Sequence, residues 1–164
     1  MKKEMVIFFS KLSLGGMERA LVEWIKNENL RKEYNITLYL GYVKERVLYD
    51  EIKDICDIHV FCKGKWNIFG KIISFIKMKT LKLKKYDVSI CYSHHHKILS
   101  ELTLKASNNN VLFIHTDLIK SRTKEELERM KNDLRIMDYK KIAISNRSIF
   151  MEDNRNKSIF REKV

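Results

Sequence analysis

Runs of apolar residues alternate with stretches of helical periodicity along the 164-residue chain. The first run, from Met5 to Phe9, is continuous rather than alternating, which is typical of a strand buried on both faces. Further strands are predicted near 36–42, 58–62, 87–92, 111–115 and 141–145, and helices over about 16–29, 45–54, 66–80, 95–106, 122–138 and 146–153. The alternation predicts an α/β fold, a Rossmann-like doubly wound parallel sheet of about six strands.

Length and composition indicate one globular domain over residues 1–164. Hydrophobic residues make up 45% of the chain, and no internal repeat, low-complexity run or linker divides it. The first apolar run is too short for a secretory signal core or a membrane span, so we expect a cytoplasmic protein. Cys56, Cys62 and Cys91 form no C-x-x-C pair, and we expect buried thiols rather than a disulfide or a structural zinc site.

The formal net charge of +12 is concentrated in one segment, residues 63–85, which holds eight lysines and no acidic residue. Its aromatic residues and isoleucines cover about half of a helical wheel, more than one core contact requires. This pattern predicts an interfacial helix on an anionic membrane surface, with Lys65, Trp66, Phe69, Lys71, Phe75 and Lys77 as the contact residues. The same pattern is equally compatible with an ordinary crossover helix whose lysines are solvated. Both interpretations hold if an inner stripe of the helix packs against the sheet and the rest of its surface contacts the bilayer.

A glycine pair, Gly15 and Gly16, separates the first strand from the first helix. Glycines at the start of a helix allow close backbone approach, and the free amide groups there favour a phosphate or another anion. Neither G-x-G-x-x-G nor G-x-x-x-x-G-K-[ST] is present, so a plain tight turn remains an equal alternative. In open α/β sheets ligands bind beyond the carboxyl ends of the strands, which makes the residues after each strand the candidates.

The stretch SLGGMERALVEW resembles the first loop and helix of family 4-like retaining glycosyltransferases of GT-B architecture. In that family a strand is followed by a loop ending in Gly-Gly, a small or apolar residue, Glu-Arg and an amphipathic helix. YNITLYLGYV resembles the second strand of the family, KKYDVSICYSH the fourth, NVLFIHTD the strand ending in His and YKKIAISNRSIF the strand ending in Ser. The resemblance extends, in order and spacing, over nearly the whole chain.

The resemblance implies roles for residues at the centre of the site. Gly15 and Gly16 would approach the donor diphosphate and the acceptor from the floor of the cleft, and Glu18 of the same motif would also bind substrate. His115 would line the reaction centre near the transferred sugar, its alternative being a histidine hydrogen-bonded at the sheet edge. Asp117 would bind a sugar hydroxyl or accept a proton, with helix capping or a solvated loop as the alternative.

Three further residues would lie at the rim of that site. Ser93 and His94 would belong to a polar acceptor-side loop, and Ser145 to the cleft edge or to a structural cap. The consecutive histidines 94–96 cannot easily converge on one ion, and relatives of this architecture generally need no metal. We therefore expect no metal and no cofactor, the nucleotide-sugar donor being a substrate.

Enzymes of this architecture have two Rossmann-like halves, and the second holds the nucleotide-sugar through a basic pair and a Glu-x-x-x-x-x-x-x-Glu motif. No such glutamate pair is present in this sequence. We therefore expect an N-terminal, acceptor-side domain without its C-terminal donor-binding domain, inactive alone. The expected reaction is transfer of a sugar to a lipid-linked or polysaccharide acceptor at the inner face of the cell membrane.

Two other classes of function compete with this interpretation. A non-catalytic Rossmann-like module could bind a glycolipid or a partner chain and complete its cleft in trans. Nucleic-acid binding through the lysines ranks last, because the basic segment lacks arginine and any base-reading motif. We therefore expect no nucleic-acid partner.

Overall fold

The computed structural model describes residues 1–63, 67–93, 96–114, 125 and 141–144 of the chain. Six parallel strands form one sheet in the order β3-β2-β1-β4-β5-β6, which confirms the predicted fold class. The strands are β1 (Lys3–Leu12), β2 (Tyr34–Val43), β3 (Asp57–Cys62), β4 (Val88–Cys91), β5 (Asn110–Ile114) and β6 (Lys141–Ile144). The helices are α1 (Gly16–Lys26), α2 (Glu28–Glu33), α3 (Val47–Ile52), α4 (Ile68–Thr80) and α5 (Lys97–Ala106).

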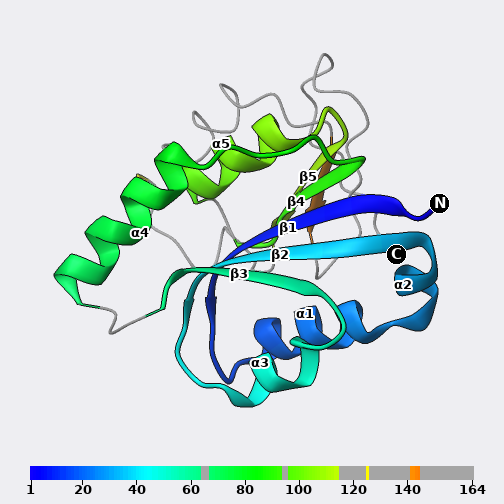
Figure 1. Ribbon diagram of the computed structural model, residues 1–164, viewed down its shortest axis with the longest axis horizontal. Helices are drawn as coiled ribbons and strands as arrows, with labels where there is room; N and C mark the ends of the chain where they lie inside the picture. Colours follow the sequence, from blue (N-terminus) through cyan, green and yellow to red (C-terminus); the bar gives the residue numbers. More distant parts are fainter. Residues whose placement is uncertain (64–66, 94–95, 115–124, 126–140, 145–164) are drawn as a thin grey trace.

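Helices cover both faces of the sheet, α1 to α3 on one side and α4 and α5 on the other (Figure 1). Successive side chains of a strand point to opposite faces, so β1 contributes to two separate cores. Val6 and Phe8 belong to the core beneath α4 and α5, whereas Met5, Ile7 and Phe9 belong to the core beneath α1 and α3. The continuous apolar run is therefore explained by burial on both faces.

The strand order reverses at β1. The chain leaves β1 through α1 and α2 to reach β2 on one side, and later returns from β3 through α4 to β4 on the other side. β1 thus pairs with β2 over most of its length and with β4 from Met5 to Phe8. Such a reversal leaves the carboxyl ends of the two central strands without a connection crossing over them.

Two elements end more than two residues away from their predicted ends. β1 runs to Leu12 rather than ending near Phe9, because β2 continues to pair with it through its polar end. The helix predicted over 16–29 is two helices, since the backbone of Asn27 is not helical (ψ 120°) and its side chain accepts hydrogen bonds from the amides of Asn29 and Leu30. The helices predicted over 122–138 and 146–153 lie outside the described residues.

A close approach of β1 and β2 occurs at Gly41, near the carboxyl end of the sheet. A Cβ at this position would overlap the backbone carbonyl oxygen of Ser10. Glycine within a strand often marks such a contact between two backbones. Gly41 therefore lets β2 lie against the part of β1 that leads into the glycine turn.

Replacing Gly41 with alanine is expected to destabilise the fold. Because the added Cβ would meet backbone rather than a movable side chain, the free energy of unfolding should fall by about 1–3 kcal/mol. Gly16→Ala is the matched control, since a Cβ there meets nothing within 4 Å. Urea denaturation followed by circular dichroism measures both, and equal stability of the two variants would contradict the close approach.

Candidate functional site

The candidate site lies at the carboxyl edge of β1 and β4, where the strand order reverses. The amide of Tyr92 donates to the carbonyl of Phe8 at 2.9 Å, extending the pairing past the end of β4. The amide of Ser10 then donates to Oγ of Ser93 at 2.6 Å. Ser93 is buried, so this hydrogen bond fixes the loop after β4 against the end of β1.

The glycine turn between β1 and α1 is built around Glu18. The Ser13 hydroxyl donates to Oε1 of Glu18 at 2.8 Å, and the Glu18 residue is only 8% exposed. The Glu18 carboxylate lies where a Cβ of Gly15 would be, whereas Gly16 faces open space. Gly15 thus makes room for a side chain of this chain, and Gly16 leaves the start of α1 accessible.

The start of α1 combines amide donors with one carboxylate. Gly15 caps the helix without a side-chain hydrogen bond, so the first amides of α1 have no capping side chain. The positive end of the helix dipole stabilises the nearby Glu18 carboxylate, an effect of about 0.3–2 kcal/mol. This arrangement can accept hydrogen bonds from hydroxyl groups at Glu18 and can donate to an anion from the exposed side of Gly16.

The structure brings Gly15, Gly16, Glu18 and Ser93 to one edge of the sheet, as parallel pairing of β1 and β4 requires. The other candidates of the site, His94, His115, Asp117 and Ser145, lie outside the described residues. β5 ends at Ile114 and β6 at Ile144, so the strands preceding His115 and Ser145 occupy their predicted places.

Sequence reasoning missed the residues that support the glycine turn. Tyr92, which precedes Ser93, is buried. Its ring packs edge-on against Phe9 with a centroid separation of 5.7 Å and parallel to Trp24 with a centroid separation of 6.3 Å. Burial raises the pKa of Tyr92 to about 12, so the phenol stays neutral. Gly41 is the one signal of this support in the sequence, because a lone glycine in an apolar strand indicates close backbone contact.

Helix α4 carries the predicted membrane-surface residues. Phe69 and Phe75 are exposed, and so are Lys71 and Lys77. Lys65 and Trp66 lie outside the described residues. No helix in the described part of the chain is long and apolar enough to cross a bilayer.

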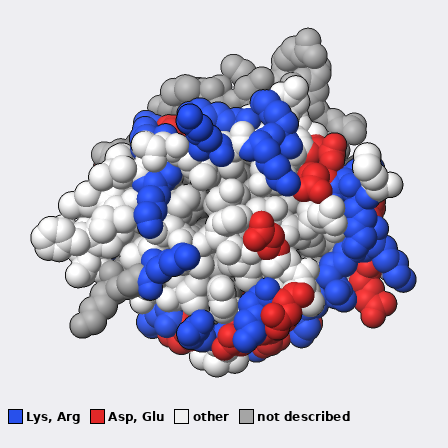
Figure 2. Space-filling model, in the orientation of Figure 1, with Lys and Arg blue, Asp and Glu red and all other residues white. Residues whose placement is uncertain are grey.

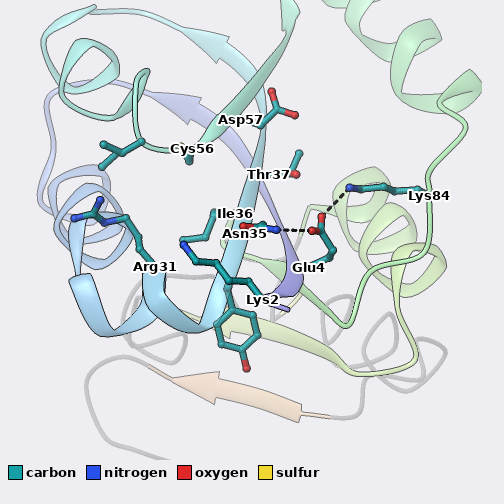
Figure 3. A pocket seen from close by; sticks show the side chains of 11 residues that line it. Lys2, Glu4, Arg31, Asn35, Ile36, Thr37, Cys56, Asp57 and Lys84 are labelled. Carbon is teal, nitrogen blue, oxygen red and sulfur yellow. Dashed lines mark hydrogen bonds and ion pairs between the residues drawn. The ribbon is translucent and has the colours of Figure 1, made fainter.

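An open pocket of about 390 Å³ lies away from the glycine turn, at the amino edge of the sheet (Figure 3). Glu4 lies within it, accepting hydrogen bonds from Asn35 at 2.8 Å and Lys84 at 2.7 Å. The bond from Asn35, and then that from Lys84, lower the pKa of Glu4. Glu4 and Lys84 are thus paired with each other, and the pocket is at the edge where open α/β sheets do not bind their ligands.

The cysteines and histidines of the described residues form no metal site. No group of three or more metal-ligating side chains occurs among these residues. Cys62 and Cys91 are buried, and the three cysteines form no disulfide with one another. Burial, with a smaller effect of Asp57, raises the pKa of Cys56 to about 12, which makes this thiol unreactive near neutral pH.

Comparison with known proteins gives a likeness in fold. No family model and no curated protein sequence matches the chain. Among solved structures, HepE of Anabaena, crystallised with UDP and glucose, superposes with a TM-score of 0.53 at 12% identity over 86% of this chain. The chain spans 38% of the HepE chain. A ribokinase-like superfamily protein of Enterococcus faecalis superposes with a TM-score of 0.42 at 8% identity, over 92% of this chain and 60% of its own.

Ser93→Ala tests the hydrogen bond that holds the two strand ends together. Because the half-buried Ser10 loses the acceptor of its amide, the free energy of unfolding should fall by about 1–3 kcal/mol. Ser74→Ala is the matched control, since the buried Ser74 hydroxyl has no hydrogen-bond partner among the described residues. Chemical denaturation should show Ser74→Ala neutral or stabilised, and a Ser93→Ala variant as stable as Ser74→Ala would refute the role of Ser93.

Proposed function

We propose that the chain is the acceptor-side domain of a glycosyltransferase that moves a sugar from a nucleotide-sugar to a lipid-linked or polysaccharide acceptor at the cytoplasmic face of the membrane. The observation that carries this proposal is the glycine turn at the strand reversal, where a buried carboxylate and the first amides of α1 share one edge. The sequence resemblance supports the same class, and the likeness to HepE supports the fold that it requires.

Glu18 is proposed to orient a hydroxyl group of the acceptor. Ser13 occupies one carboxylate oxygen, and no described residue donates to the other. A carboxylate repels a diphosphate but accepts hydrogen bonds from sugar hydroxyls, so Glu18 suits the acceptor rather than the donor phosphates. The exposed side of Gly16 is where the amide groups can meet a phosphate of the donor.

The proposed reaction follows the retaining class that the sequence resembles. The bond between the anomeric carbon and the diphosphate breaks, and the acceptor oxygen forms its bond to that carbon on the same face. The acceptor proton passes to the leaving diphosphate, so no protein nucleophile is required. His115 and Asp117 are proposed to complete the site around the transferred sugar.

A non-catalytic module that binds a glycolipid or a partner chain in trans is the second candidate. The missing Glu-x-x-x-x-x-x-x-Glu motif favours it, because this sequence carries no donor-binding signature of its own. The reading frame beyond Val164 distinguishes the two. A second Rossmann-like segment with that motif supports the enzyme, whereas co-purification with a separate donor-domain chain supports the module.

UDP-glucose and glucose are the probes for the proposed site. In two-dimensional NMR of the isotopically labelled chain, shifts are expected at the amides of Gly15, Gly16 and Ser93. Gly16→Leu should weaken UDP-glucose binding at least tenfold without changing the unfolding midpoint, because a Cβ at this position meets no atom within 4 Å. Val47→Leu, an exposed change at the start of α3, is the control. Shifts confined to Lys2, Arg31 and Lys84 would instead place binding at the amino edge.

The isolated chain is expected to show no sugar transfer. A domain that contacts the donor only through the start of α1 lacks the glutamate motif that holds the nucleotide-sugar for transfer, so release of UDP or GDP from sugar donors should stay at the uncatalysed rate. Joining the chain to its donor-binding domain should restore turnover. Efficient transfer by residues 1–164 alone would show that this chain is not one half of such an enzyme.

A further inference from the structure

Helix α4 has its apolar and small residues in the reverse of the usual arrangement. Its buried positions are Gly70, Ser74 and Met78, a single stripe at intervals of four residues that faces the body of the protein. Its large apolar residues point outward instead: Ile68 and Phe69 are each 74% exposed, and Ile72, Ile73, Phe75 and Ile76 are 49–53% exposed. An ordinary surface helix buries such residues, so this face is built for contact with another apolar surface.

The charges around this face are of one sign. No acidic residue occurs between Lys63 and Lys85. Lys63, Lys71 and Lys82 form no ion pair with any described residue, and Lys77 donates to a backbone carbonyl, that of Phe61. Figure 2 shows the uncharged lobe formed by α4, with lysine side chains beside it. The apolar face is thus bordered by free positive charge.

The position of α4 relates this face to the candidate site. Because α4 follows β3 in a parallel sheet, it begins at the carboxyl edge, the same edge as the glycine turn. Its first turn holds the two most exposed residues, Ile68 and Phe69, and Figure 1 shows this end of α4 projecting away from the sheet.

We infer that the outward face of α4 is a docking surface for an anionic lipid bilayer, with Ile68, Phe69, Ile72, Ile73, Phe75 and Ile76 entering the acyl boundary and the lysines contacting the headgroups. The inference rests on the proposed function and deepens it. A bilayer on α4 lies at the carboxyl edge, so it brings a lipid-linked acceptor to the edge that holds Glu18.

A bilayer fits these observations better than a protein partner. A second copy of this chain would place one cluster of lysines against the same cluster, and like charges repel. The outward isoleucines and phenylalanines are spread along the whole helix rather than gathered around one pocket, which suits a continuous apolar phase. Lysine stems also extend beside an apolar face while their charged ends reach the headgroup level.

Vesicle co-sedimentation of the 164-residue chain tests the inference. Vesicles of phosphatidylcholine with 30–40% phosphatidylglycerol, about the anionic content that draws basic segments to a surface, are compared with phosphatidylcholine alone. Phe69→Asn combined with Ile72→Asn should lower the partition coefficient for anionic vesicles at least tenfold. Lys71→Glu should lower it several-fold, and 0.5 M salt should weaken wild-type binding, a concentration at which surface charge is screened within about 4–5 Å.

Matched variants control for general effects. Val47→Asn changes an equally exposed apolar residue on α3, and Lys32→Glu makes the same charge change on α2, and neither should alter vesicle binding. Equal binding of the Phe69→Asn, Ile72→Asn variant and wild type would overturn the inference. A second outcome would also overturn the inference. Wild type would fail to bind vesicles and would instead form a concentration-dependent dimer, seen by sedimentation velocity, that the Phe69→Asn, Ile72→Asn variant abolishes.

The same variants separate this inference from the proposed function. UDP-glucose binding at the glycine turn should be unchanged in the α4 variants, because they alter only outward side chains. Loss of vesicle binding with intact UDP-glucose binding supports the docking surface by itself. Wild-type vesicle binding without any ligand shift at Gly16 would uphold docking and overturn the sugar-transfer proposal.

Discussion

The pairing of β1 with β4 is the constraint on which the rest of the molecule depends. β1 is buried on both faces, and Phe8 and Phe9 occupy opposite cores. Burying a phenylalanine contributes about 1.5–3 kcal/mol, so the apolar run places β1 firmly at the centre of the sheet. The connection from β1 leads to β2 on one side of it, and the later connection from β3 leads to β4 on its other side. The polar carboxyl ends of β1 and β4 are therefore uncovered at one edge of the sheet.

The sheet was predictable because its signal is local, whereas the support of the site is not. Continuous apolar runs identify buried strands, and all six strands occur where these runs predict them. The hydrogen bond between Ser10 and Ser93 joins residues 83 apart, and nothing in either segment indicates that β4 lies beside β1. The break at Asn27 was missed for another reason, since its side chain competes with the helix for backbone amides.

The packing of helix α4 was likewise not predictable from local sequence patterns. The width of its apolar arc was readable from the sequence, and periodicity favours burying part of that arc, but the structure turns all the isoleucines and phenylalanines of α4 outward. Tertiary contact selects the stripe of Gly70, Ser74 and Met78, in which Gly70 and Ser74 are small enough to let the helix lie close to β3 and Met78 joins the core. The bulky side chains are consequently turned outward, although hydrophobicity alone predicts them inside.

Topology connects these two features of the chain. Each helix of a parallel sheet begins at the carboxyl edge, so α1 and α4 start at the same edge even though they cover opposite faces (Figure 1). The polar turn before α1 offers a carboxylate and amides, and the first turn of α4 offers apolar side chains. A molecule with a sugar head and a lipid tail needs both kinds of surface within its own length. The parallel topology supplies both surfaces at one edge of this domain.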